Sequence, residues 1–504
     1  MVAIVFPTSS SPGLRPQESA GRLINAFVEK AESGSPGQTL WRRSAGLIYG
    51  GSSTSPHTRG FQAYRDTDEL ATGNRGWATA LWVTNGAIHL LVENPGTGEY
   101  SVNFIGAWGG EDPVTMARNH ALVRQVVGVS SEGAFVLTDS AAPVPYVEVD
   151  TDLPPFPTSV CSHDGYFVWS YQNGRIYSND LPNTTAVNAL SFNTEQGQAV
   201  LRVVSFSGRL YAMGDKWIGV YKDAGTTPFP FLREATIPRG ILSTHAVAGW
   251  EPGWSNELIW VGDDHIVYKL NGYTPVPISN DAVSRDIQAS VLHGCQLEAF
   301  VYMFGKNAFW ALNAGHPFRP EFRWTWEYNA STGQWTERRS QGHLCWKGHK
   351  SIRGRRDWLL GDQFFPYFFR VREEYFKEAD SPEDSSPSTW TVESGVMSGF
   401  PMRTTIPKAS FNITSAAGRV PGPDDAVGVA APTVRIYWSL DGGLTWGVPV
   451  VRSLGPPGDG RYYPSVMCSG LSRGFGIRYR LEVTDAVHVG LAGGEIEVQP
   501  RAPV

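Results

Sequence analysis

The segment 439–446 brings a carboxylate, two hydroxyls and an indole together within eight residues. It follows the Asp-box pattern Ser-x-Asp-x-Gly-x-Thr-Trp, which is carried by Ser439, Asp441, Gly443, Thr445 and Trp446. In such a turn the aspartate accepts backbone N–H groups, glycine supplies a positive φ and tryptophan covers the hairpin. Because the single copy lies outside the repeats described below, it predicts a turn that stabilises the fold rather than a catalytic site.

The Asp-box also resembles those of sialidases, so a glycosidase is an alternative function. Sialidase chemistry would require an arginine cluster for the substrate carboxylate and a Tyr/Glu nucleophile pair. No motif marks either set, and neither a phosphate-binding P-loop nor His-Glu-x-x-His occurs. We therefore expect a protein that is not an enzyme and that has no catalytic residues and no cofactor.

The segment 347–356 holds five cations in ten residues: Lys347, Lys350, Arg353, Arg355 and Arg356. Such a cluster fits a loop that faces phosphates or another subunit. The alternative is a solvated loop balanced by the acidic residues Glu373, Glu374 and Glu378. We expect this basic segment at an interface with another subunit or a neighbouring protein.

Two further groups of residues have simpler interpretations. His343, Cys345 and His349 are close enough to suggest a metal site, but a fourth ligand is missing, so we expect no metal. The aromatic runs at 324–328 and 364–369 fit sugar or base stacking, or packing between strands. The second run has aromatic residues on both strand faces, which favours burial or a subunit contact.

The elements that carry these residues are strands. Asn85-Gly86 joins two apolar runs within 77–92, a strong signal for a hairpin. Further hairpins are predicted at 164–178, 207–221, 257–268, 300–312 and 357–371. The turn glycines Gly214, Gly262, Gly305 and Gly361 stand 48, 43 and 56 residues apart. A hairpin every 40–50 residues predicts a β-propeller of six or seven blades; a pair of β-sandwiches is the alternative.

The fold class is therefore all-β, with a β-propeller followed by a C-terminal β-sandwich-like domain. The predicted parts are an N-terminal arm (1–35), the propeller (36–376), an acidic Ser/Pro-rich linker (377–389) and the sandwich (390–504). The arm is expected to hold one short helix over 21–32, because Leu23, Ile24, Phe27 and Val28 fall on one side of it.

Composition supports this assignment. The chain of 504 residues has 55 Gly, 35 Pro and 12% aromatic residues, and only 18% charged residues against a typical value of about 25%. These values exclude a disordered chain and a coiled coil. The net charge of −6 argues against a surface that grips nucleic acid throughout. The four cysteines are isolated, which suits a reducing cytoplasm, and neither a signal peptide nor a membrane span is expected.

Short motifs follow one another in a fixed order along the chain: 25–27, 41–46, 59–60, 164–168, 207–211, 237–240, 267–275, 438–446 and 480–485. They include Asp164-Gly-Tyr-Phe-Val168, Ser207-Gly-Arg-Leu-Tyr211 and Ile237-Pro-Arg-Gly240. This order resembles the packaged-DNA stabilisation proteins of short-tailed bacteriophages, also described as tail hub or nozzle proteins. The likeness covers roughly residues 22–500.

The resemblance implies a structural virion protein of the phage tail that is assembled in the host cytoplasm. Such proteins form a ring, expected to be a homohexamer, below the portal and the head-to-tail adaptor. The ring continues the channel for double-stranded DNA, helps to retain the packaged genome, gives a path for its ejection and docks tail fibres or spikes. No stable membrane insertion is expected. The alternatives are a propeller-type glycosidase or carbohydrate-binding tail protein, and a general propeller platform for protein interactions.

Overall fold

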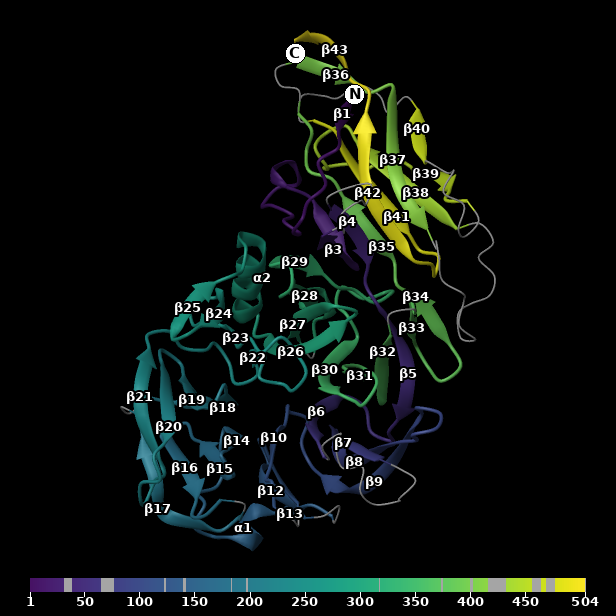
Figure 1. Ribbon diagram of the computed structural model, residues 1–504. Helices are drawn as coiled ribbons and strands as arrows, with labels where there is room; N and C mark the ends of the chain where they lie inside the picture. Colours follow the sequence, from purple (N-terminus) through teal and green to yellow (C-terminus); the bar gives the residue numbers. More distant parts are fainter. Residues whose placement is uncertain are drawn as a thin grey trace.

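The computed structural model describes residues 1–30, 39–64, 77–121, 124–138, 142–182, 184–195, 198–316, 318–372, 375–398, 402–415, 432–455, 464–467 and 476–503. Within them the regular secondary structure is nearly all β, as the sequence predicts. Figure 1 shows two bodies, a wheel of small sheets and an elongated sandwich against one side of the wheel. No helix in this described part is long and apolar enough to cross a bilayer.

Six blades of the wheel each use four strands that are consecutive in the chain. Blade 1 contains β6 (Thr58–Ala63), β7 (Trp77–Thr84), β8 (Gly86–Glu93) and β9 (Tyr100–Trp108). Blade 2 contains β10 (Thr115–Arg118), β11 (Gln125–Ser130), β12 (Gly133–Thr138) and β13 (Val144–Pro145). Blade 3 contains β14 (Ser159–His163), β15 (Tyr166–Ser170), β16 (Arg175–Asn179) and β17 (Val187–Thr194).

The next three blades continue in the same way. Blade 4 contains β18 (Val200–Phe206), β19 (Arg209–Gly214), β20 (Ile218–Asp223) and β21 (Phe231–Ile237). Blade 5 contains β22 (Val247–Ala248), β23 (Ile259–Val261), β24 (Val267–Asn271) and β25 (Thr274–Pro277). Blade 6 contains β26 (Gln296–Phe304), β27 (Asn307–Gly315), β28 (Trp324–Asn329) and β29 (Gln334–Glu337).

Blade 7 closes the wheel with strands from both ends of the propeller segment. It combines β30 (Gly348–Arg353), β31 (Trp358–Asp362) and β32 (Tyr367–Arg372) with the early strand β5 (Gly46–Ser52). β5 pairs antiparallel with β32, so a strand from the N-terminal side supplies the fourth strand of a blade whose other three strands come from the C-terminal side of the propeller segment. The described residues therefore make seven blades, within the predicted range of six or seven.

All six predicted hairpins are present as antiparallel strand pairs. Five of them join the second and third strands of a blade, whereas the hairpin at 300–312 joins the first and second strands of blade 6. Because this hairpin comes one strand earlier in its blade than the others, Gly305 follows Gly262 after only 43 residues and precedes Gly361 by 56. No hairpin is predicted between the turns at Asn85 and Asn173, which are 88 residues apart. The structure has one there, formed by β11 and β12 with its turn at Ser131-Glu132.

The sandwich combines C-terminal strands with the first 43 residues. One sheet contains β3 (Ala26–Lys30), β4 (Thr39–Arg43), β42 (Val489–Ile496), β37 (Lys408–Ser415) and β40 (Ser465–Met467), with β1 (Val2–Ala3) beside β42. The other contains β2 (Arg22–Ile24), β35 (Trp390–Glu393), β41 (Arg478–Val483), β38 (Thr433–Ser439) and β39 (Val450–Ser453). A separate pair is formed by β36 (Met402–Thr405) and β43 (Gln499–Pro503).

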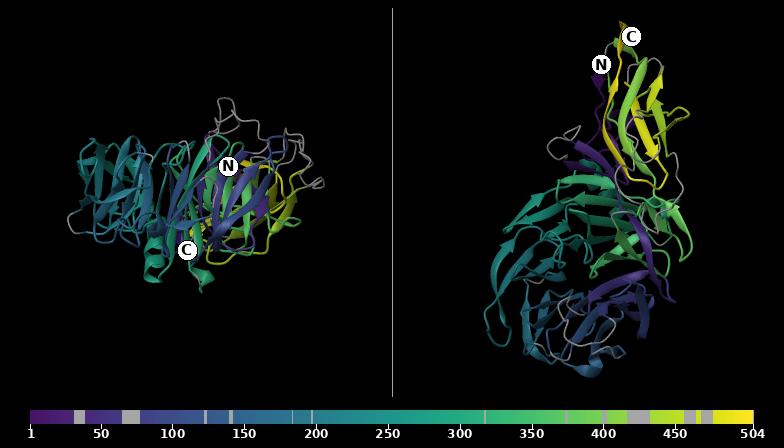
Figure 2. Two further views of the ribbon diagram at one scale, coloured as in Figure 1. Left: turned by 90° about the horizontal axis from the view of Figure 1, so that it is seen from below. Right: turned by 45° about the vertical axis from the view of Figure 1, so that its right-hand side comes forward.

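The core between the two sheets holds Phe6, Trp41, Trp390, Phe411 and Tyr479. Because β2 also pairs with β29, the second sheet runs on into blade 6. Residues 377–389, predicted as a linker, carry β33 (Lys377–Ala379) and β34 (Ser385–Pro387), and β33 pairs with β5. The bodies are thus joined by strand pairing (Figure 2).

The prediction of a helix over 21–32 is wrong. The segment forms β2 and β3, which are separated by Asn25 in a left-handed conformation (φ 52°). The Asn25 side-chain amide donates to Arg339 O and Thr389 O, at 2.9 and 3.0 Å. The real helices lie elsewhere: α1 (Tyr146–Val149) and α2 (Asp281–Leu292), with short 3-10 turns η1 (Pro16–Glu18) and η2 (Pro320–Phe322).

Candidate functional site

The basic segment begins as a strand rather than a loop. Its residues 348–353 form β30, the strand of blade 7 nearest the axis of the wheel (Figure 1). The expectation of a loop is therefore wrong for this half of the segment, because β30 completes the ring of inner strands between β26 and β6. The remaining residues, 354–357, form the turn into β31.

The two lysines of the segment have partners inside the protein. Lys347 is buried, and its Nζ donates to Ala379 O at 2.9 Å and to Asp380 Oδ1 at 2.6 Å. Lys350 forms an ion pair with the buried carboxylate of Glu298 on β26. Both ammonium groups thus stabilise contacts between elements, and neither is free to bind an external phosphate.

The arginines of the segment lie near the turn and are exposed. Arg353 Nη1 donates to Gly253 O at 2.9 Å, and Arg356 Nη2 donates to Pro95 O at 2.8 Å. Arg353, Arg355 and Arg356 therefore gather cationic charge on one rim of the propeller. The acidic residues expected to balance the segment do not do so in the described part: Glu378 is buried and accepts the Trp346 indole N–H at 2.8 Å. Glu373 and Glu374 lie outside the described residues.

A polar cluster occupies the region between the inner strands of blades 6 and 7. The imidazole of His349 is stacked on that of His57, with ring centroids 5.6 Å apart, and its Nε2 lies 3.4 Å from Glu298 Oε2. Burial lowers the pKa of His349 to about 3, so this ring is neutral at pH 7. Burial alone would raise the pKa of Glu298, but the ammonium group of the neighbouring Lys350 lowers it far below the usual range. The carboxylate is therefore ionised and joins two blades.

A loop of blade 5 extends this set of contacts. The Arg202 guanidinium, on the inner strand β18, lies 5.3 Å from the Trp250 ring, and burial lowers its pKa to about 10. Glu251 accepts the N–H of Gly249 at 2.7 Å. The backbone carbonyl of Gly253, in the same loop, accepts the hydrogen bond from Arg353. Arg202 of blade 4 thus contacts the blade 5 loop, Arg353 of blade 7 donates to a backbone carbonyl of the same loop, and Lys350 joins blade 7 to blade 6.

The Asp-box forms a compact turn after β38. Asp441 Oδ1 accepts the Ser439 hydroxyl at 2.7 Å and the Thr445 N–H at 2.9 Å, and Oδ2 accepts the Thr445 hydroxyl at 2.6 Å. Burial raises the pKa of Asp441, but these hydrogen bonds lower it below its usual value. Gly443 has φ 100°, and Arg480 lies over the Trp446 ring at 4.2 Å. Both carboxylate oxygens are therefore engaged in the turn.

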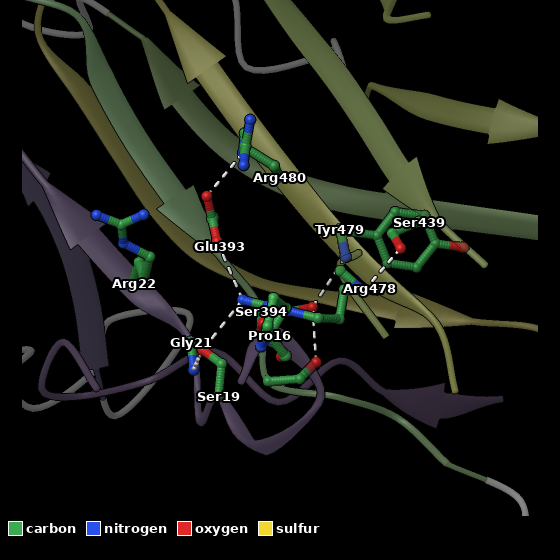
Figure 3. A network of polar contacts seen from close by, with 12 residues as sticks. Pro16, Ser19, Gly21, Arg22, Glu393, Ser394, Ser439, Arg478, Tyr479 and Arg480 are labelled. Atoms are coloured by element: carbon green, nitrogen blue, oxygen red, sulfur yellow. Dashed lines mark hydrogen bonds and ion pairs between the residues drawn. The ribbon is translucent and has the colours of Figure 1, made fainter. Parts of the chain in front are cut away.

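The same part of the sandwich contains a buried arginine that links three segments (Figure 3). Arg478 donates to Glu393 Oε2 at 3.0 Å, to Pro16 O at 3.0 Å and to the Ser19 hydroxyl at 3.2 Å. Arg480, on the same strand, donates to the other oxygen of Glu393 at 2.7 Å. The N-terminal segment is thereby fixed to β35 and β41.

The residues considered for metal binding are not brought together. His343 stacks on Phe364 with centroids 4.7 Å apart, Cys345 is buried beside Gln363, and His349 belongs to the polar cluster between blades 6 and 7. Within the described ranges no group of three or more suitable side chains surrounds a common point. Cys468 lies outside these ranges.

The aromatic runs take different positions. In the first run, Trp326 and Tyr328 are buried, and the indole N–H of Trp326 donates to Asp286 of α2 at 2.8 Å. In the second, Phe368 and Phe369 are buried, whereas Phe365 is 51% exposed. Strand packing therefore accounts for most of both runs but leaves one exposed ring at the β31–β32 turn.

Sequence reasoning missed His57 and Glu298 of the polar cluster between blades 6 and 7, and the buried His245, which interacts with Glu298, Lys350 and His349. Residues 245, 298 and 349 stand about one blade apart, so a comparison of the repeats in phase would have grouped them. It also missed that residues 470–474 (Gly-Leu-Ser-Arg-Gly) match the Gly-x-Ser-x-Gly pattern of hydrolases. That pattern acts at a strand-to-helix turn of an α/β sheet, and this segment lies outside the described residues of an all-β chain.

Comparison with known proteins gives one family. The model of the family described as "Bacteriophage P22 Gp10, beta-propeller" matches residues 59–363, from blade 1 into blade 7. No curated protein matches the chain. The similar solved structures include the WD40 β-propeller domain of Doa1, with 8% identity over 65% of this chain and 96% of that one and a TM-score of 0.37. The designed Ika8 protein has 12% identity over 70% and 99% of the two chains, with a TM-score of 0.35.

Proposed function

The chain belongs to the bacteriophage P22 Gp10 β-propeller family, whose members are structural proteins that stabilise packaged DNA, and from this premise we propose that it is a ring-forming hub or nozzle of a phage tail. Copies of the chain, six in the expected ring, surround the DNA path below the portal and the head-to-tail adaptor. The ring retains the packaged genome and later gives it a way out, while tail fibres or spikes dock at its periphery.

The family match over residues 59–363 does not by itself require a ring; contacts between neighbouring blades supply a further argument. Lys350 contacts Glu298 across two blades, and Arg202 packs on the Trp250 ring of a third. Inner strands that are held together in this way leave no opening between these adjacent blades for a DNA duplex, whose major groove alone is about 12 Å wide. A protein of this family that stabilises DNA would therefore do so on a surface shared by several copies.

The charge of the chain supports a path along which DNA slides. With a net charge of −6, a ring of these subunits offers few cations to displace the counterions of DNA, so it would not hold the duplex tightly. Arg353, Arg355 and Arg356 are exposed together on one rim, where Arg356 also lies 3.7 Å from Glu93 Oε1. We place this rim at a contact with the next subunit or a neighbouring tail protein.

A reconstruction of the intact virion tail tests the proposal. The expected result is a closed ring of this chain on the tail axis, next to the adaptor, with the Arg353–Arg356 rim in a protein contact. A single copy, or copies away from the axis, would overturn the ring. A ring whose Arg353–Arg356 rim projects into solvent would overturn only the placement of the rim.

A further inference from the structure

Charge is distributed unevenly around the propeller. Residues 296–372, which form blade 6 and most of blade 7, contain twelve Lys or Arg and six Asp or Glu. Residues 125–174, in blades 2 and 3, contain six Asp or Glu and neither Lys nor Arg. These regions lie across the wheel from each other (Figure 1). By composition, the propeller is therefore more basic in blades 6 and 7 and more acidic in this part of blades 2 and 3, and we call these regions the basic side and the acidic side.

The basic side carries exposed apolar side chains on neighbouring connections. They are Leu292 at the end of α2 (80% exposed), Phe318 between β27 and β28 (87%), Leu344 before β30 (48%) and Phe365 between β31 and β32 (51%). We call this set the aromatic face. Apolar side chains that gather on the surface of a soluble protein usually mark a contact with another molecule.

Stacked rings show that the aromatic face is continuous. His293 stacks on Phe322 with centroids 3.9 Å apart, which joins the end of α2 to the β27–β28 connection. Arg323 lies over Phe364 at 5.1 Å, and His343 stacks on the same ring at 4.7 Å. The four connections are thus one surface, which carries Arg319 and Arg323 as cations and Glu321 as an acidic residue.

The acidic side presents a second apolar set on the segment 144–156, which we call the acidic segment. Its exposed apolar side chains are Val144 (39%), Val147 (64%), Val149 (44%) and Phe156 (65%). Glu148 and Asp152 stand among them and are also exposed. The segment thus combines exposed apolar side chains with carboxylates and has no cation.

The acidic segment is held firmly although these side chains are exposed. Tyr146 is buried; its ring packs on Trp169 at 5.4 Å, and its hydroxyl donates to Thr185 O. The Tyr171 hydroxyl donates to Pro154 O at 2.7 Å. A segment fixed in this way presents its valines with little loss of conformational entropy on binding.

We propose that the aromatic face of one copy binds the acidic segment of the next copy. The two surfaces complement each other in charge, and each supplies exposed apolar area for the other to cover. They lie on opposite sides of the wheel, so the contact is head-to-tail, the kind that generates a ring when it closes. The inference rests on the proposed ring and names the surfaces that would build it.

The test uses one variant on each surface, Phe318→Asp on the aromatic face and Val147→Asp on the acidic segment. Both side chains are more than 60% exposed, so the fold does not depend on them. In sedimentation of the purified full chain over a range of concentrations, the wild type is expected to self-associate, and each variant to do so at least about tenfold more weakly. Mixing the variants should give a 1:1 dimer, because each retains the surface that the other lacks.

The control is Val448→Asp, at a position in the sandwich that is 85% exposed and outside both surfaces. It should associate like the wild type, and circular dichroism should show that all variants are folded. A wild type that stays monomeric at every concentration, variants that associate like the wild type, or a mixture without a 1:1 dimer would each overturn the interface. None of these results bears on the tail reconstruction, so the proposed function is judged separately.

Discussion

The propeller and the sandwich solve the same problem, the burial of sheet faces, with chain segments of very different separation. Blades 1 to 6 each use consecutive strands, so most of their pairings join residues within one repeat. In the sandwich, β2 pairs with β35 and β4 pairs with β42, across more than 360 residues. Local repeats therefore build the wheel, whereas the ends of the chain must meet to build the sandwich and to close blade 7.

The two regions also differ in what fills their contacts. Between blades 3, 4 and 5 the buried clusters are aliphatic and aromatic, although a polar cluster joins blades 6 and 7. Where the sandwich meets the wheel, buried arginines join distant segments. Arg43 donates to Val487 O at 3.1 Å and to Ser388 O, and Arg338 lies over Trp346 at 4.5 Å and donates to Ala45 O. A guanidinium has five N–H donors, so it satisfies carbonyls from several strands at once.

The closing strand gives the largest expected effect. Leu47 on β5 is fully buried in the main core cluster, and Leu47→Asp would place a carboxylate there without a partner. We expect a loss of at least about 4 kcal/mol in the free energy of unfolding. Urea titration followed by tryptophan fluorescence measures it.

The matched control is Ser52→Asp, at the exposed end of the same strand. It should change stability by less than about 0.5 kcal/mol. Equal losses in the two variants would mean that β5 does not close the propeller through its buried face.

Local pairing also decides which elements the sequence predicts. Asn85-Gly86 and Asn173-Gly174 specify their hairpins through residues within a few positions, and both hairpins are confirmed. Residues 21–32 carry apolar pairs that suit a helix or a buried strand equally, and their partners β4, β29 and β35 lie far along the chain. The residues of this segment do not show which distant strands will pair with it, and for this reason the helix prediction fails.

The candidate site follows the same rule. The number of cations in 347–356 can be read from the sequence. The ion pairs of Lys347 with Asp380 and of Lys350 with Glu298 cannot, because they depend on the neighbouring elements. The aromatic run at 364–369 predicts burial, which Phe368 and Phe369 show. That Phe365 joins Phe318 and Leu344 on one face follows only from the arrangement of the blades.

The seam of the sandwich gives the next effect. Arg478 is buried and pairs with the buried Glu393, so Arg478→Met would leave that carboxylate with Arg480 alone and remove the bonds to Pro16 and Ser19. We expect a loss of about 3 kcal/mol, measured by urea unfolding. Arg480→Met, at a side chain that is 25% exposed, should cost about 1 kcal/mol. The reverse order would show that the N-terminal segment is not held by Arg478.

The junction of the N-terminal segment with blade 6 should respond to acid. Burial raises the pKa of Glu337, but Arg22, Arg339 and the Ser10 hydroxyl lower it overall below its usual value of 4.5. A carboxylate with a lowered pKa in the folded state adds stability that is complete above about pH 4.5 and is lost as the pH falls through the folded-state value.

We therefore expect Glu337→Gln to be less stable than the wild type by about 1–2 kcal/mol at pH 7, the usual size of a hydrogen bond to a charged group, and to approach it as the pH falls below 4.5 through the folded-state pKa. Thermal unfolding across that range measures the difference. Glu321→Gln, at an exposed position of blade 6, should follow the wild type at every pH. A Glu337→Gln deficit that stays constant with pH would assign the loss to packing rather than to charge.

The smallest effect belongs to the Asp-box, where every bond is local and the turn lies near the surface. Asp441→Ala removes the acceptors of the Thr445 N–H and hydroxyl, and because water can replace them we expect a loss of about 1 kcal/mol. Asp441→Asn keeps one carbonyl acceptor and should lose less, again by urea unfolding. If Asp441→Ala costs as much as Arg478→Met, the turn supports the sandwich as strongly as the buried seam does, and the contrast between local and distant contacts does not hold in this domain.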